Sequence, residues 1–251
     1  MTNIFSKLYN NKKEELYFER DMSPDKSRKL KANIDENLNI VQEYLYDCDD
    51  VITRDFYMGL TPKHKMSLMY IDGMVQMTTV QEDILKPLML FARQFSLEHS
   101  VGEKFFDMVK EGLLTAGDLK ETDIFGEVIL GILSGDTVLF IDKFEKALLI
   151  STRGWEKRGV QEPSTEAVIR GPRDGFTETY RTNVALVRRR LKDPNLKVKT
   201  IKLGRHTRTD VGIMYIQGVA KPSIVDEVLK RLNTIDISCV LESGYIEQMI
   251  E

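Results

Sequence analysis

Blocks of apolar and polar positions alternate along this chain in a way that is typical of α/β proteins. In the first half, a helix period follows Ser23-Pro24, a good helix start, and it places these apolar residues on one face: Leu30, Ile34, Leu38, Val41 and Leu45. Runs with the length and composition of strands occupy residues 51–57, 68–72, 137–142 and 146–151, and the last two are close enough to form a hairpin. A further helix is predicted over residues 79–91.

The second half of the chain repeats this alternation of strands and helices. Residues 198–203 and 211–219 predict two strands that pair antiparallel across a basic polar turn. A helix is expected to start after Pro222-Ser223, and apolar positions over 245–250 predict a last helical turn or two.

A connector with strong turn signals separates the two halves. Residues 159–165 show no apolar period and contain Pro163, so neither a helix nor a strand should pass through them. Val168 and Ile169 predict a short strand that ends in a Gly-Pro-Arg-Asp-Gly turn at 171–175, where the glycines supply positive φ. Asp174 or Thr177 can cap the helix that follows, whose apolar face is expected to hold Phe176, Tyr180, Val184, Val187 and Leu191.

Two segments of the chain resemble each other. Residues 66–88 and 211–232 share an apolar strand, the sequence Tyr-Ile-x-Gly, a short polar stretch and a helix ending in Leu-Lys-x-Leu. Their separation of about 145 residues suggests two α/β lobes of related topology. Chance similarity is the alternative, because strand-turn-helix units are common building blocks.

These patterns predict an α/β fold with two small lobes, each holding a mixed β-sheet flanked by helices, as in two-lobed solute-binding proteins. We expect a mobile N-terminal segment at 1–22, a first lobe at 23–152, a connector at 153–167 and a second lobe at 168–251. Charge supports this division. Residues 1–150 hold 18 Lys and Arg against 26 Asp and Glu, a net of −8, and the remainder holds 18 against 13, a net of +5, which together give the −3 of the whole chain. The halves should therefore attract each other or different partners.

Composition favours a soluble, cytosolic type of chain. No window approaches the ~20 apolar residues that cross a bilayer, and the polar N-terminus does not have the pattern of a signal peptide. Cys48 and Cys239 lack metal or redox spacing, so free thiols are expected.

The sequence offers no catalytic set, and we predict a protein that is not an enzyme and needs no cofactor or metal. The three histidines, His64, His99 and His206, are far apart and without ligand spacing, and no nucleophile elbow or phosphate-binding loop appears. The acidic residues at 47, 49 and 50 have no companion acid or ligand, so we interpret them as a solvated approach to a strand.

The turn before the predicted helix is the candidate binding site. Arg170, Arg173, Asp174 and Gly175 combine fixed positive charge with exposed backbone N–H groups at a helix start, which suits a small carboxylate or phosphate. The alternative is that these arginines pair with acidic residues of the other lobe or of a neighbouring subunit. Arg153 and Trp155 in the connector are further candidates, with Trp155 packed at the junction.

A run of basic residues makes nucleic acid a possible binding partner to consider. It comprises Arg188, Arg189, Arg190 and Lys192, joined by Arg205, His206 and Arg208. No aromatic residues interleave with it as a stacking platform, so nucleic acid is not the expected partner. Anionic lipid headgroups or acidic partner subunits suit the same charges better.

Three long segments carry a resemblance to a known family: LLISTRGWEKRGVQEP at 148–163, VIRGPRDGFTETYRTN at 168–183 and KLGRHTRTDVGIMYIQGVA at 202–220. They resemble the A subunit of the GerA family of spore germinant receptors, and the similarity extends over roughly 47–251. The resemblance implies a part in nutrient-triggered germination, with B and C partner subunits, other A subunits in an ion-conducting oligomer, and membrane helices that follow this region. It also implies a location at the spore inner membrane, with this region on the core side.

The sequence is compatible with three hypotheses for the function. The resemblance favours a sensor or assembly module that passes a signal to membrane helices. A second hypothesis is binding of an amino acid, sugar or ion in a cleft between the lobes. An enzyme is the third, and the missing catalytic residues speak against it.

Overall fold

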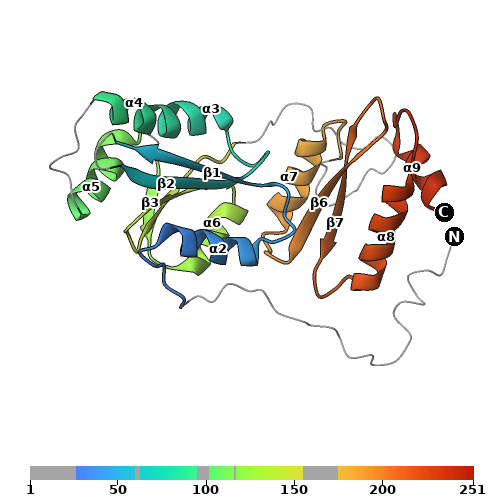
Figure 1. Ribbon diagram of the computed structural model, residues 1–251, viewed down its shortest axis with the longest axis horizontal. Coiled ribbons are helices and arrows are strands. Elements are labelled where there is room, and N and C mark those ends of the chain that lie inside the picture. Colours follow the sequence, from blue (N-terminus) through green and yellow to red (C-terminus); the bar gives the residue numbers. More distant parts are fainter. Residues whose placement is uncertain (1–26, 60–62, 95–101, 116, 155–174) are drawn as a thin grey trace, which may run out of the picture.

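Two separate sheets organise this protein, as the computed structural model shows for residues 27–59, 63–94, 102–115, 117–154 and 175–251 (Figure 1). We call the part from α2 to β5 the first lobe and the part from α7 to α9 the second lobe. The predicted N-terminal segment, the strand at 168–169 and most of the connector lie outside the described residues. The boundaries predicted from the sequence therefore stay predictions.

The first lobe is built on a five-stranded antiparallel sheet in the order β1-β2-β4-β5-β3. Its strands are β1 (Val51–Met58), β2 (His64–Ile71), β3 (Leu119–Thr122), β4 (Thr137–Ile141) and β5 (Ala147–Ile150). The predicted hairpin is confirmed, since β4 pairs with β5 from Thr137↔Ile150 to Phe140↔Ala147. All residues of β4 and β5 are buried, and all of them except Thr137 are apolar.

Helices cover both faces of this sheet. On one face lie α2 (Ile34–Tyr44) and α6 (Phe125–Leu133); on the other lie α3 (Met77–Thr79), the π-helix η1 (Val80–Leu85), α4 (Lys86–Gln94), α5 (Glu103–Asp107) and the π-helix η2 (Met108–Leu113). Two buried apolar clusters, one on each face, form the core. The helix predicted over 79–91 is confirmed within the run α3-η1-α4, and α5, η2, β3 and α6 had not been predicted.

The first helix starts later than its apolar period suggests. Asn33 is its N-cap, and the Asn33 side chain accepts hydrogen bonds from the backbone N–H groups of Asp35 and Glu36. Leu30 is buried as expected, but it lies in an extended segment whose N–H donates to the Asp123 carbonyl at 2.8 Å. The predicted start after Ser23-Pro24 was wrong for this reason, because a good N-cap decides where helical bonding begins.

The second lobe has three layers. Its sheet is the antiparallel pair β6 (Leu196–Leu203) and β7 (Thr209–Ile216), with α7 (Tyr180–Arg190) on one face and α8 (Pro222–Thr234) and α9 (Ser243–Ile250) on the other. Both strands and the helix start at Pro222 confirm the sequence predictions. In both lobes every pairing between named strands is antiparallel, so the α/β class is confirmed while the expected mixed sheets were wrong.

The helix α7 begins one turn later than its predicted apolar face. Thr179 is the N-cap, without a side-chain cap, and the Thr177 hydroxyl accepts from the Thr179 N–H instead of capping the helix. Phe176 therefore lies before the helix and is 74% exposed. Its predicted place on the apolar face was wrong.

The internal repeat is visible in the positions of the elements. The strand bounds Val51, Met58, His64 and Ile71 recur as Leu196, Leu203, Thr209 and Ile216, each 145 residues later, and the two hairpins share one register. A helix precedes each hairpin. After each hairpin, a glycine with positive φ, 82° at Gly73 and 84° at Gly218, leads to the next helix. This agreement supports a duplicated helix–hairpin–helix unit.

Candidate functional site

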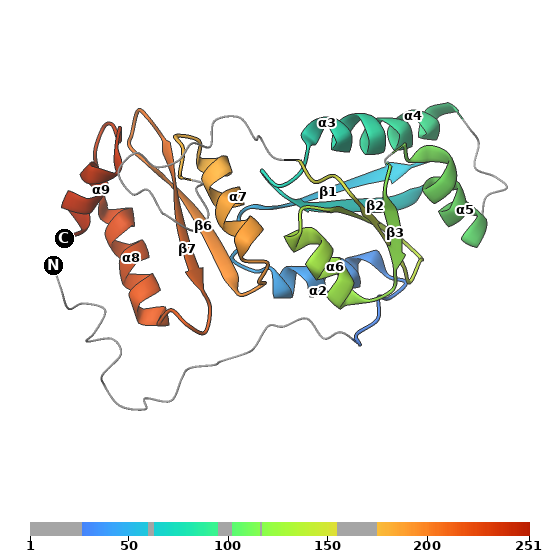
Figure 2. The ribbon, with the colours of Figure 1, turned by 180° about the vertical axis from the view of Figure 1, so that it is seen from behind.

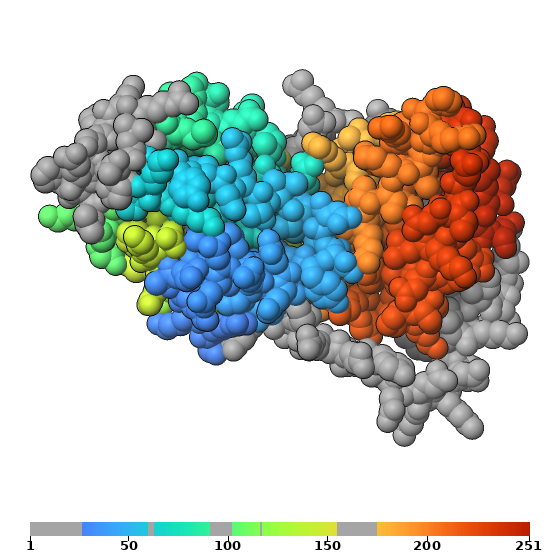
Figure 3. Space-filling model, in the orientation of Figure 1, coloured from blue at the N-terminus to red at the C-terminus, as the bar shows by residue number. Residues whose placement is uncertain are grey.

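The junction between the lobes is formed by the turn that joins α2 to β1. The Asp49 N–H donates to the Val198 carbonyl at 2.9 Å, and the Val198 N–H donates to the Asp47 carbonyl at 3.0 Å. Cys48 and Val198 thereby form a parallel bridge, and the turn pairs with one edge of β6. The surfaces of the two lobes meet without a gap in Figure 3, where the pale blue of this region touches the orange of the second lobe.

A buried ion pair lies at the centre of this junction. The Arg188 guanidinium on α7 donates to both carboxylate oxygens of Asp50, at 2.7 and 2.9 Å, and the two side chains are 0% and 7% exposed. Burial lowers the pKa of Arg188, but the hydrogen bonds and charge of Asp50 outweigh burial, and the net direction is upward. Removing one member of such a pair strands a buried charge, at a cost of about 3–5 kcal/mol.

Further polar contacts surround that pair. Lys199 forms an ion pair with Asp47 at 2.9 Å, and the backbone N–H of Thr200 donates to the Asp49 carboxylate at 2.7 Å. The buried Lys197 ammonium donates to the Tyr44 carbonyl at 3.2 Å and lies 3.9 Å from the centre of the Tyr46 ring. Burial lowers the pKa of Lys197.

Tyr215 of β7 completes this group from the second lobe. Its hydroxyl donates to the Asp47 carboxylate at 3.4 Å. Burial, followed by the negative charge of Asp47, raises the pKa of Tyr215 to about 12. The phenol therefore stays protonated and keeps its donor role at neutral pH.

A second contact lies at the turn after β2. Arg181 of α7 pairs with Asp72 at 3.0 Å, and a Cβ on Gly73 would lie 3.0 Å from the Arg181 carbonyl. Ala185 belongs to the buried core of the first lobe, so α7 packs against both lobes, as Figure 2 shows from behind. Three interlobe ion pairs, involving Asp47, Asp50 and Asp72, thus use part of the opposite charges of the two halves.

The acidic residues at 47, 49 and 50 were predicted to be a solvated approach to a strand, and they do precede β1; Asp47 and Asp49 are exposed, but the interpretation was wrong for Asp50, which is buried. They contact the second lobe because the α2–β1 turn directs them toward β6, which no local pattern reveals. The basic run at 188–190 was likewise not a continuous exposed surface, since Arg188 is fully buried. The excess of acidic residues in one half and of basic residues in the other was the sequence feature that could have indicated these contacts between the lobes.

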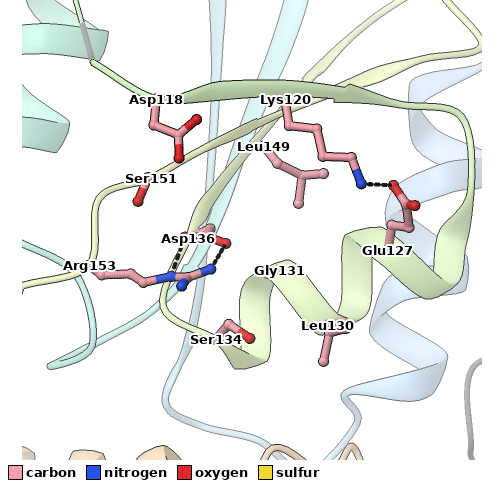
Figure 4. Close-up of a pocket in the computed structure, with 10 residues that line it drawn as sticks. All are labelled: Asp118, Lys120, Glu127, Leu130, Gly131, Ser134, Asp136, Leu149, Ser151 and Arg153. Carbon is pink, nitrogen blue, oxygen red and sulfur yellow. Dashed lines mark hydrogen bonds and ion pairs between the residues drawn. The ribbon is translucent and has the colours of Figure 1, made fainter.

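A polar cavity of about 400 Å³ lies in the first lobe, between α6 and the strands β3 and β5 (Figure 4). Arg153 donates through Nε and Nη2 to the two carboxylate oxygens of Asp136, both at 2.7 Å, and these hydrogen bonds raise the pKa of Arg153. Lys120 pairs with Glu127 at 2.8 Å on the opposite wall. The remaining lining residues are Asp118, Leu130, Gly131, Ser134, Leu149 and Ser151.

The predicted site residues are only partly visible. Arg153 lines this cavity and is 49% exposed, and it is paired with Asp136 of the first lobe. Gly175 lies half-buried five residues before α7. Trp155, Arg170, Arg173 and Asp174 lie outside the described residues, so their binding role stays a prediction.

Within the described ranges, no group of three or more His, Cys, Asp or Glu side chains is placed to hold a metal ion. In the same part of the chain, no helix has the length and apolar character needed to cross a membrane.

Comparisons with known proteins lead to spore germination. The family model for the Bacillus/Clostridium GerA spore germination protein matches residues 39–251. Spore germination protein KA of Bacillus subtilis (strain 168) is 35% identical over 222 residues, which cover 88% of this chain and 40% of the relative. The uncharacterized membrane protein YfkQ of the same strain is 35% identical over 244 residues, covering 96% of this chain and 45% of the relative. The chain thus spans less than half the length of these relatives.

A solved structure shares the fold. The crystal structure of the N-terminal domain of the A subunit of the Bacillus megaterium spore germinant receptor GerK3 matches with a TM-score of 0.68 and 32% identity, over 89% of this chain and 80% of that one.

Proposed function

Since the chain belongs to the GerA family of spore germination proteins, we propose that it is the N-terminal domain of a germinant receptor A subunit and acts in receptor assembly and signal transmission. The family match over residues 39–251 and the similarity to the GerK3 domain support this proposal. The names of the curated relatives cited above describe a germination protein and a membrane protein. They favour a receptor component over an enzyme.

The observation that carries the mechanism is the buried junction. Asp50 and Arg188 are joined by two hydrogen bonds away from water, and backbone bonds tie Asp47 and Asp49 to Val198. Such a contact makes the lobes move together, because opening it would expose paired charges that are costly to separate. A partner that displaces one lobe would then displace the other, and the domain acts as a rigid relay.

The alternative, binding of a small molecule by closure of an interlobe cleft, requires the lobes to rotate against each other. The described contacts oppose that rotation. The rigid relay is therefore the better supported mechanism.

The setting of this relay follows from the family. We propose B and C subunits and other A subunits as partners, with a location at the spore inner membrane and this domain on the core side. The GerK3 receptor has an A subunit, which supports a receptor made of several subunits, and the name of YfkQ supports a membrane setting.

Locking the lobes together tests the relay directly. Val198→Cys places a second cysteine opposite the native Cys48 across their parallel bridge. Neighbouring strands lie about 4.8 Å apart, which is within the Cα separation of about 4.4–6.8 Å that a disulfide spans. In spores that carry the full-length receptor, we expect the oxidised, locked protein to support nutrient-triggered loss of optical density at the same rate as the reduced protein. Val198→Ala serves as the control for lost packing.

Loss of germination in the oxidised form, with recovery on reduction, would contradict the relay and favour a closing cleft. Saturable binding of a nutrient by the purified chain that disappears on locking would do the same.

A further inference from the structure

Large apolar side chains are exposed on α9 and at its start. This helix lies at the end of the second lobe that is farthest from the first lobe (Figure 1). Leu241 is 77% exposed, Tyr245 41% and Met249 45%. Tyr245 and Met249 are four residues apart in the helix, so they share one face. Leu241 comes directly before the N-cap residue Glu242.

The rest of the second lobe holds this element in place. The segment before α9 is bonded to the turn between β6 and β7, where the Arg205 N–H donates to the Ile237 carbonyl at 2.9 Å. On the inner side of α9, Ile246 and Ile250 pack against the apolar core of the lobe. Side chains on a fixed helix lose little conformational entropy when a partner buries them, so this face is suited to binding.

The charges around this face are all negative. Residues 235–251 contain no Lys, Arg or His, and their four acidic residues, all exposed, are Asp236, Glu242, Glu247 and Glu251. Their formal net charge is therefore −4. Residues 151–234 hold 18 Lys and Arg against 9 Asp and Glu, a net of +9. The segment with α9 is thus an acidic, partly apolar surface in an otherwise basic half of the chain.

Apolar side chains flanked by carboxylates are complementary to a basic amphipathic segment. The apolar side of such a segment would cover Tyr245 and Met249, and its Lys or Arg side chains would approach Glu247. The same carboxylates would repel an anionic lipid surface, which favours a protein as the partner. Membrane proteins concentrate Lys and Arg in their cytoplasmic loops, so the membrane part of a receptor is a source of basic segments.

We propose that the exposed face of α9, with Leu241, Tyr245 and Met249, is a docking surface for a basic amphipathic segment in the membrane part of the receptor. The inference rests on the proposed function and names the chemistry of the partner that receives the displacement. The stretches that match this chain cover 40% and 45% of two curated relatives, one of which is named a membrane protein. These relatives have room for such a part.

A synthetic peptide can test the chemistry of this surface. The probe is a fluorescent amphipathic peptide of Leu and Lys, about 18 residues long so that it can form a helix. A peptide of Leu and Glu with the same pattern is its control. Fluorescence anisotropy with the purified chain should show saturable binding of the Leu/Lys peptide, at least about tenfold tighter than that of the Leu/Glu peptide. The affinity should fall as salt is added.

Variants of exposed residues locate the binding site. Tyr245→Ala should weaken binding of the Leu/Lys peptide at least about fivefold, as expected for an anchor residue, while Tyr57→Ala, at a tyrosine 61% exposed on β1, should leave it unchanged. Glu247→Lys should also weaken binding at least about fivefold, because it places a like charge opposite the peptide. Glu43→Lys on α2 makes the same charge change at an exposed residue of the first lobe and should have little effect.

Equal affinity for the two peptides would overturn the inference, as would binding that Tyr245→Ala and Glu247→Lys leave unchanged. Sedimentation of the chain with vesicles of phosphatidylglycerol and phosphatidylcholine, lost in Tyr245→Ala, would overturn it in favour of a lipid surface. The relay has a separate test in the lock between Cys48 and Val198→Cys, which does not involve α9. Either hypothesis can therefore fail without the other.

Discussion

At the scale of single residues, one buried ion pair and one half-buried histidine are the most informative polar features of this domain. Arg188 and Asp50 form an ion pair that neither local pattern nor residue type predicts, since a run of three arginines usually marks an exposed surface. The half-buried His64 is the other: its ring stacks on Phe105 with centroids 3.8 Å apart, and its buried Nε2 has no hydrogen-bond partner among the described residues.

Arg188→Met should destabilise the chain by about 3–5 kcal/mol, because Asp50 is left buried and charged. Urea denaturation measures this loss. The matched control is Arg181→Met, at an ion pair whose arginine is 70% exposed, where about 0–1 kcal/mol is expected. The double variant Asp50→Leu/Arg188→Met should recover most of the stability, since it removes both charges. An equal loss in the Arg188 and Arg181 variants would contradict the central role of the buried pair.

Stability should also fall in mild acid because of His64. Burial, with the charge of Lys143, lowers the pKa of His64 from its usual 6.5. As the pH falls, the unfolded chain therefore takes up a proton at a higher pH than the folded chain does. The contribution of neutral His64 to the free energy of unfolding is fully present above about pH 6.5 and is lost as the pH falls through the folded pKa. Denaturation at about pH 7.5 and about pH 5 should show a smaller difference for His64→Leu than for the natural chain.

At the scale of elements, the repeated helix–hairpin–helix unit explains why two halves of different size share one local plan. Each copy ends its hairpin in a glycine with positive φ, a conformation that L-residues adopt only with strain. In the first copy, this turn also packs against α7 of the second lobe. The turn thus ends the hairpin and also forms a contact between the lobes.

Gly73→Ala should test that double role. Its Cβ would meet the Arg181 carbonyl at 3.0 Å in addition to the strain of φ 82°, and we expect a loss of about 1–3 kcal/mol. Gly102→Ala is the matched control, because Gly102 has φ 68° and nothing within 4 Å of an added Cβ. The Gly73 variant should unfold at lower urea than the Gly102 variant. Equal losses would mean that the contact with α7 contributes nothing.

At the scale of the whole molecule, the lobes are joined by contacts between residues far apart in the chain. The opposite net charges of the two halves indicated attraction, and the three interlobe ion pairs are one place where that attraction acts. A domain fixed in this way suits the transmission of a displacement better than closure around a ligand.

The sequence by itself determined the α/β class, the described strands other than β3, the helices at 79–91 and after Pro222, the repeat and the family. These features depend on periodicity, turn residues and long motifs, which are local and can be read along the chain. Only the tertiary structure decided that Asp50 meets Arg188, that Phe176 is exposed and that Arg153 lines a cavity. Those outcomes depend on which surfaces the folded chain brings together, and a carboxylate or an arginine has the same local pattern whether it faces water or a distant partner.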